Sequence, residues 1–265
     1  MQWAAHAAHD ADTSLRIVSV VGDNEIAASD MRVEGPVSWA PEAAEQARLV
    51  ATQTCPELRV EKVTRFGRAG PVLAQEDDGS LLVVVGRRGG SSMTERLLGS
   101  TAISTVKHAH SPAVVVPASP MPHSHAPVVV GLGSDGDDEV LEAAFREAQR
   151  LHVPLRAIRT WTVPPEFGWD TAILYEEFPR RQRETHRALG ELVEPWAAKY
   201  ADVPIEMRVE HGIPAVVLKE AAAHASAVVI GNRGERIHRP QSGLGSVARS
   251  VLHHATSPIM VVRAH

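Results

Sequence analysis

The sequence is poor in cysteine and has no long apolar run. Its 265 residues contain one cysteine, Cys55, which can form no disulfide within the chain and lacks the partners of a thiolate metal site. No stretch approaches the ~20 apolar residues of a membrane-spanning helix, and the N-terminus does not resemble a signal peptide. These absences predict a cytoplasmic protein with no membrane partner.

Clustered basic residues are also missing. Lysine and arginine together number 27 against 32 acidic residues, which gives a formal net charge of -5. Proteins that bind a nucleic-acid backbone need a basic run or patch to neutralise phosphates, and no Lys/Arg-rich run is present. The sequence therefore predicts no nucleic-acid partner.

The residue patterns of common catalytic sites are absent as well. No Ser-His-Asp order, pair of catalytic carboxylates or metal-hydrolase spacing stands out, so we expect no catalytic residue and at most weak ATP hydrolysis. The 14 histidines include His123, His125 and the pair His253-His254. Neighbouring histidines rarely converge on one ion without a third ligand, so no metal site is predicted.

The sequence contains the same pattern of strands, glycines and helices twice. Residues 81–116 and 227–262 each hold a buried-strand run, glycines, a helical stretch, a Ser-Pro pair and a final apolar strand. Upstream, Gly67 and Gly212 lie at the same distance before Gly86 and Gly231, and residues 1–20 align without a gap on residues 141–160. The chain is therefore predicted to be an internal duplication.

Strands and helices alternate within each copy. The second copy reads as strands at 128–132, 155–161, 205–209 and 227–231, with helices at 138–152, 176–200 (interrupted near Pro195) and 215–224. This order favours an α/β fold with a parallel sheet covered on both faces. We expect one domain at 1–117, a Pro-, Ser- and His-rich linker at 118–126 and a second domain at 127–265.

The last strands of the two copies, 113–116 and 259–262, are short and apolar. Such strands are candidates for exposed sheet edges, so we expect them to lie near a mutual interface in an intramolecular pseudo-dimer. A homodimer through the same strands is a further expectation.

The first copy lacks the beginning of the pattern. Residues 1–11 align with the first helix of the second copy, and nothing corresponds to residues 127–140. Because the first strand is usually central in such a sheet, the first domain should lose a central strand. A rearranged sheet, a strand borrowed from a partner, or a start upstream of Met1 would each explain this, and we favour the upstream start.

The glycines after the fourth strand of each copy are candidate phosphate ligands. In the first copy Gly86 and Gly89 follow the strand, nine residues intervene, and Gly99-Ser100 opens a helix. Backbone N–H groups at glycines and at a helix N-terminus can bind an anion, and Arg87 and Arg88 could add charge. The alternative is that the glycines only permit tight turns.

This spacing resembles that of the universal stress protein family, whose nucleotide-binding members carry Gly-x2-Gly-x9-Gly-Ser/Thr. The second copy keeps the motif with ten residues in place of nine, and we expect Pro240 and the extra residue to distort the loop at 236–244. The resemblance implies two tandem Rossmann-like domains, of the adenine nucleotide alpha hydrolase-like type, with parallel five-stranded sheets.

The resemblance also implies an ATP site in each domain. By position, its residues in the first copy would be Val20, Gly86, Arg88, Gly89, Gly99 and Ser100. In the second they would be Gly131, Gly133, Thr160, Gly231, Arg233, Gly234, Gly245 and Ser246. The family's adenine-side aspartate is absent, since Gly133 occupies its place and Asp135 lies two residues later.

Three functions remain open. The first is an ATP-binding stress-response regulator or chaperone-like factor, with magnesium only as the nucleotide's companion. The second is a nucleotide-independent interaction module, which the missing aspartate favours. The third, an ATP pyrophosphatase or nucleotidyltransferase, requires a phosphate loop after the first strand, and the segment 131–136 offers neither a basic residue nor a histidine pair.

Overall fold

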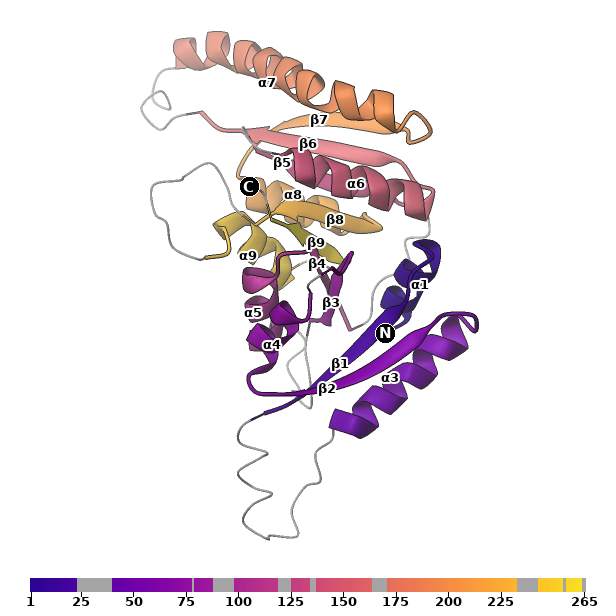
Figure 1. Cartoon of the computed structure of the whole chain (residues 1–265). Helices are drawn as coiled ribbons and strands as arrows, with labels where there is room; N and C mark the ends of the chain where they lie inside the picture. The colour runs from indigo at the N-terminus through magenta and orange to yellow at the C-terminus, as the bar shows by residue number, and fades with distance from the viewer. Residues whose placement is uncertain are drawn as a thin grey trace.

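The structure is a computed structural model that describes residues 1–22, 40–77, 79–87, 98–118, 125–133, 137–163, 171–232, 243–254 and 256–263. Its strands form a seven-stranded sheet in the order β3-β4-β9-β8-β5-β6-β7 and a separate pair, β1-β2 (Figure 1). The larger sheet includes strands from both halves of the chain.

The second half forms a complete doubly wound unit. Its elements are β5 (Val128–Leu132), α6 (Asp138–Leu151), β6 (Leu155–Trp161), α7 (Thr171–Lys199), β7 (Ile205–His211), α8 (Pro214–Ala222), β8 (Ala227–Gly231), α9 (Ser246–His254) and β9 (Ile259–Val262). All neighbouring strands in this unit pair in parallel, and β5 lies in the centre between β6 and β8. The predicted five-stranded parallel sheet is confirmed.

Burial on both faces explains the apolar sequence of the central strand. Val128, Val129 and Val130 are 0% exposed, because alternate residues point to opposite sides of the sheet. Val130 packs in a cluster with residues of α6 and α7, whereas Val129 packs with residues of α8 and α9. Two helices therefore cover each face.

Several element boundaries differ from those predicted, among them those of α7, β7 and β3. Helix α7 begins at Thr171 and continues through both Pro179 and Pro195, so the predicted interruption is wrong. Both prolines lie on exposed positions, where water can satisfy the carbonyl that loses its helical partner. Strand β7 runs two residues further, to His211, and β3 starts at Val83.

The first half has the same elements except one. They are α1 (Gln2–Asp10), β1 (Leu15–Val21), α3 (Ala40–Thr54), β2 (Val60–Phe66), α4 (Ala69–Gln75), β3 (Val83–Gly86), α5 (Ser100–His108) and β4 (Ala113–Val116). Within the described residues, no strand lies between β1 and β3, which is the place that β5 takes between β6 and β8. The expected loss of the central strand is confirmed, and it divides the four remaining strands into two pairs.

The final strands of the two halves meet. Strand β4 pairs antiparallel with β9, with Val114 opposite Met260, and both side chains are buried. The predicted proximity of these strands is confirmed. Because β4 also pairs with β3 and β9 with β8, both strands have a neighbour on each side within the chain, and a homodimer through them stays a prediction.

Backbone details repeat between the halves. Asp12 and His152 end equivalent helices with positive φ of 48° and 53°, and Gly67 and Gly212 follow equivalent strands with φ of 122° and 152°. Gly67 and Gly212 can adopt such positive φ values readily because glycine has no Cβ. The alignment made from sequence is thus reproduced in the local geometry.

Candidate functional site

A matching backbone hydrogen bond closes the glycine loop in each half. The N–H of Gly99 donates to the carbonyl of Arg87 at 2.9 Å, and the N–H of Gly245 donates to the carbonyl of Asn232 at 2.9 Å. Each bond joins the end of a strand, β3 or β8, to the start of a helix, α5 or α9. Arg88 and Gly89 of the first loop and Arg233 and Gly234 of the second lie outside the described residues, as does most of the segment 236–244 expected to be distorted.

The two helices begin in the same way after these bonds. The first helical bonds run from Ile103 N to Gly99 O at 3.1 Å and from Arg249 N to Gly245 O at 2.9 Å. The N–H groups before them, including those of Ser100 and Ser246, have no partner inside their helix. Neither first turn contains an acidic residue. Each helix start therefore presents donors and the positive end of its dipole to the carboxyl edge of the sheet.

In the second half the candidate residues come from adjacent parallel strands. Gly131 on β5 is in register with Ile158 on β6 and Ile230 on β8, so the carboxyl ends of these strands share one edge. Thr160 and Gly231 lie at that edge. The direction of winding changes between β5 and β8, and ligands of doubly wound proteins bind at such a switch point.

In the first half the equivalent residues are separated. Val20 lies on β1 in the two-stranded sheet, whereas Gly86 lies on β3 in the seven-stranded sheet. Gly99 and Ser100 accompany Gly86 at the start of α5. The missing strand thus removes the element that brings the two sides of this candidate site together.

Local packing and hydrogen bonding explain why glycine occurs at two positions at the end of β5. A Cβ on Gly131 would lie 2.6 Å from Cδ1 of Leu218, so the glycine lets α8 pack against the strand. The N–H of Gly133 donates to Oδ2 of Asp137 at 2.6 Å. Sequence analysis pointed to Asp135, which lies outside the described residues, and did not identify Asp137 as the partner of this loop.

Arg87, considered above as a phosphate ligand, is directed to the other half of the chain. Its Nη2 donates to the backbone carbonyl of His253 in the last turn of α9. A guanidinium suits this place, because helix C-termini carry partial negative charge. Burial lowers the pKa of the His253 imidazole, and the positive charges of His254, Arg87 and Arg249 lower it further.

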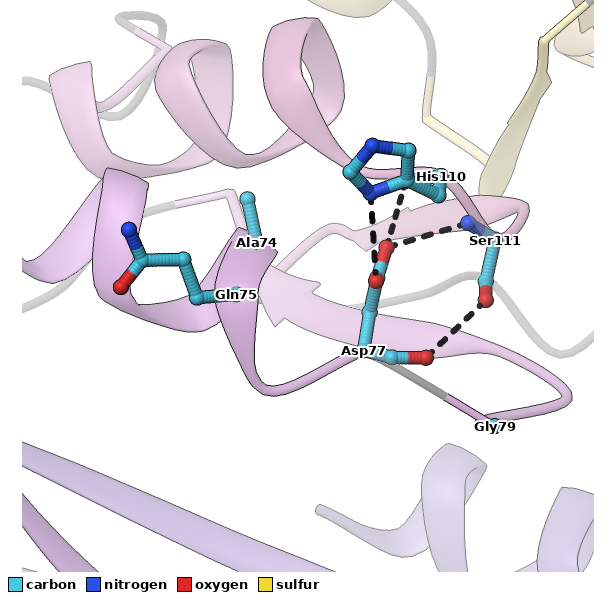
Figure 2. Close-up of a pocket in the computed structure, with 6 residues that line it drawn as sticks. All are labelled: Ala74, Gln75, Asp77, Gly79, His110 and Ser111. Carbon is cyan, nitrogen blue, oxygen red and sulfur yellow. Dashed lines mark hydrogen bonds and ion pairs between the residues drawn. The ribbon is translucent and has the colours of Figure 1, made fainter.

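A surface pocket beside α4 and α5 brings together a carboxylate, a histidine and a serine (Figure 2). Asp77 is buried, and its Oδ2 accepts the backbone N–H groups of His110 at 2.5 Å and Ser111 at 3.0 Å. The Ser111 hydroxyl donates to the carbonyls of Asp77 and Ser80. His110 Nδ1 lies 3.5 Å from Asp77 Oδ1, and the Ser111 hydroxyl donates to carbonyls and not to a base, so the group connects two turns and does not form a nucleophilic triad. The second half has Ala222 in place of Asp77 by the Gly67–Gly212 alignment.

The described residues contain neither a metal-binding cluster nor a membrane-spanning helix. Among the residues that the structure describes, no group of three or more histidine, cysteine, aspartate or glutamate side chains is placed to hold a metal ion. In the same part of the chain, no helix has the length and apolarity that crossing a bilayer requires.

Strand order, winding and helix placement define this chain as a duplicated, doubly wound α/β protein. The model of the universal stress protein family matches residues 1–117 and 125–263. The chain belongs to the universal stress protein family.

Relatives in mycobacteria resemble nearly the whole chain. Universal stress protein Rv1996 of Mycobacterium tuberculosis is 32% identical over 99% of this chain and 90% of its own length. A universal stress protein of Mycolicibacterium smegmatis is 34% identical over 99% of this chain and 92% of its own.

Solved structures share the fold at lower identity. A universal stress protein from Archaeoglobus fulgidus superposes with a TM-score of 0.63 at 17% identity, covering 99% of this chain and 90% of that one. One from Pseudomonas aeruginosa gives 0.63 at 16% identity, covering 98% and 95%.

Proposed function

We propose that the second half binds an adenine nucleotide, ATP with its accompanying magnesium ion, at the carboxyl edge of β5, β6 and β8. The observation that carries this proposal is the bond from Gly245 N to Asn232 O, which holds the start of α9 beside the end of β8. The unpaired N–H groups and the dipole of α9 then face the switch point of the sheet. Family membership supports the same reading.

The proposed ligands divide by the part of the nucleotide they contact. Phosphates would be bound by the glycine loop and the helix start, through Gly231, Arg233, Gly234, Gly245 and Ser246. The adenosine would lie against the ends of the neighbouring strands, near Gly131, Gly133 and Thr160. Since the N–H of Gly133 already bonds to Asp137, this residue would contact the nucleotide only by its backbone surface.

The first half is proposed not to bind nucleotide on its own. Val20 is on a different sheet from Gly86, Gly99 and Ser100, so the adenosine side and the phosphate side of that site are separated. The expected stoichiometry is one nucleotide per chain.

The proposed role is that of a cytoplasmic stress-response regulator whose nucleotide state changes its stability or its choice of partner. We also propose that the chain consists of a first domain at 1–117, a linker at 118–126 and a second domain at 127–265. Cys55 is a free, buried thiol, which suits a reducing compartment. The competing function is an interaction module without nucleotide, which the occupied N–H of Gly133 and the absent family aspartate favour.

Two matched serine variants test the site. ATP binding is measured by calorimetry on the wild type, Ser246→Ala and Ser100→Ala, after nucleotide retained on purification has been removed and identified by mass spectrometry. A hydroxyl hydrogen bond to a charged group is worth about 1.5–3 kcal/mol, so Ser246→Ala should weaken binding by about tenfold or more. Ser100→Ala should leave the affinity unchanged. No binding by the wild type would favour the interaction module, and equal losses in both variants would contradict the single-site stoichiometry.

A further inference from the structure

The last turn of α9 is contacted by a charged side chain from the first half of the chain. Nη2 of Arg87, which follows β3, donates to the carbonyl of His253, one residue before the end of α9. Carbonyls in the last turn of a helix have no partner inside the helix, and the helix dipole gives them partial negative charge. The guanidinium therefore bonds one of these carbonyls and compensates the charge at this end of α9.

Backbone bonds and packing hold both sides of this contact in place. The N–H of Arg87 donates to the carbonyl of Val116 at 2.8 Å, and the carbonyl of Arg87 accepts the N–H of Gly99 at 2.9 Å. On the other side Leu252, next to His253, is 2% exposed. A shift of either side would break these bonds or unpack a buried side chain.

One apolar cluster joins the two halves around this contact. It includes Ala102 and Val106 of α5 together with Ala248 and Val251 of α9, and both helices cover the same face of the seven-stranded sheet (Figure 1). Strands β4 and β9 pair with each other in that sheet. A change in α9 therefore reaches Arg87 through a continuous set of packed elements.

The opposite end of α9 is the phosphate side of the nucleotide site proposed above. There the N–H of Gly245 donates to the carbonyl of Asn232, and the first helical bond runs from Arg249 to Gly245. The nine residues of α9 span about 14 Å at 1.5 Å per residue. Negative charge at the last turn opposes the binding of an anion by the same helix, and the guanidinium of Arg87 reduces that opposition.

The contact has no charged equivalent in the other direction. By the alignment of the two halves, the counterpart of Arg87 is Asn232, which carries no charge. The buried Oδ1 of Asn232 has no hydrogen-bond partner in the part of the chain that the structure describes. The guanidinium is thus placed on the helix of the half that is proposed to bind nucleotide.

We propose that Arg87 of the first half is a positioning residue for the nucleotide of the second half. It compensates the C-terminus of α9 and thereby strengthens phosphate binding at the N-terminus of the same helix. The effect is reciprocal, because two sites that are coupled change each other's binding free energy equally. Bound phosphate therefore fixes Arg87 and its loop more firmly. This inference rests on the proposed nucleotide site and adds that the first half sets the affinity of that site.

Calorimetry with ATP, AMP and adenosine tests this role, because the three ligands differ in phosphate charge. Arg87→Gln should weaken ATP binding by about fivefold, the usual size of a charge effect at a helix end, weaken AMP binding less and leave adenosine binding unchanged. Arg87→Lys keeps the positive charge and should recover most of the ATP affinity. Arg187→Gln removes the same charge from an exposed position on α7, so it should bind all three ligands as the wild type does.

Amide hydrogen exchange with saturating ATP tests the reverse direction. Exchange at Gly99, whose N–H bonds to the carbonyl of Arg87, should slow by about threefold or more in the wild type and stay unchanged in Arg87→Gln. Gly245, beside the phosphates, should slow in both proteins, which shows that nucleotide is bound. Gly67, whose N–H donates to Val21 on the two-stranded sheet, is the internal control and should not change.

The possible results separate the role of Arg87 from the existence of the site. If the wild type binds ATP and Ser246→Ala weakens that binding, but Arg87→Gln binds ATP as the wild type does, the site stands and the role of Arg87 is wrong. Equal losses of ATP and adenosine affinity in Arg87→Gln would also overturn it, because they report only weakened packing between the halves. If the wild type binds no adenine nucleotide, the proposed site and the role of Arg87 are both wrong.

Discussion

Asp10 and Arg150 occupy equivalent positions in the two halves of the chain, and they form an ion pair with each other. Asp10 Oδ2 lies 2.7 Å from Arg150 Nη1, and Nη2 of the same guanidinium lies 2.7 Å from Glu147 Oε1. The guanidinium also lies over the ring of Trp3, 5.3 Å from its centroid. Glu147 is only 3% exposed, so Arg150 compensates a buried charge at the contact between the halves.

Arg150→Gln should therefore destabilise the protein more than Asp10→Asn. Removing one partner of a buried ion pair costs about 3 to 5 kcal/mol, because the other charge stays buried without compensation. Asp10 is one-third exposed, so its loss should cost about 1 kcal/mol or less. The free energy of unfolding in urea measures both. Equal losses would mean that the contact between the halves, and not the burial of Glu147, dominates the effect.

Acid should weaken the contact between α9 and the first half. Burial, followed by the charges of His254, Arg87 and Arg249, lowers the pKa of His253 below its ordinary 6.5. The unfolded chain then binds a proton more readily than the folded one. The stability from this residue is complete above pH 6.5 and is lost as the pH falls toward the lower, folded-state pKa.

His253→Gln should make the melting temperature less dependent on pH just below 6.5. The comparison is made between variant and wild type across that window. An unchanged slope in His253→Gln would show that this imidazole does not couple protonation to folding.

Gly131 and Gly190 should respond in opposite ways to alanine. The Cβ of Gly131→Ala meets the buried side chain of Leu218, and overpacking of this kind costs about 1–3 kcal/mol. Gly190 lies inside α7 with nothing within 4 Å of an added Cβ, so alanine there should stabilise by about 0.5–1 kcal/mol. Chemical denaturation tests both. A neutral Gly131→Ala would indicate that the side chain of Leu218 moves aside easily.

Ser111 and Ser257 hold equivalent positions with unequal bonding. Ser111 donates to two carbonyls, whereas the buried Oγ of Ser257 has no partner in the described part of the chain. Ser111→Ala should lower the free energy of unfolding by about 1–2 kcal/mol, and Ser257→Ala should be close to neutral. Thermal denaturation of the two variants decides the point. Similar losses would show that Ser257 has a bonded partner in solution.

Repeated patterns made most of the fold predictable. The repeated pattern in residues 81–116 and 227–262 and the apolar runs predicted the order of strands in the two copies and the loss of one strand from the first copy, because buried strands and tight glycine turns depend on local sequence. The division into two sheets depends on whether β1 and β3 can close together. That is a question of packing and is not encoded in either strand alone.

Polar contacts were harder to foresee for the same reason. Asp77 reads as an ordinary loop residue until β3 and β4 place His110 and Ser111 beside it. Arg87 lies next to a glycine motif and so suggested a phosphate ligand, yet its partner, the carbonyl of His253, is 166 residues away. Only the joining of the halves through β4 and β9 creates that contact.

The pairing of β4 with β9 also affects how the two halves can change over time. When two identical subunits meet about a twofold axis, every substitution appears on both sides and has to suit its own copy. Here β4 and β9 belong to different segments of one chain, so the two sides of their contact can differ in sequence. Arg87 of the first half, for example, has Asn232 as its counterpart in the second. A substitution on one side of the β4–β9 contact can therefore create a new interaction while the other side stays unchanged. Dilution cannot part the two sides, because a single polypeptide carries both.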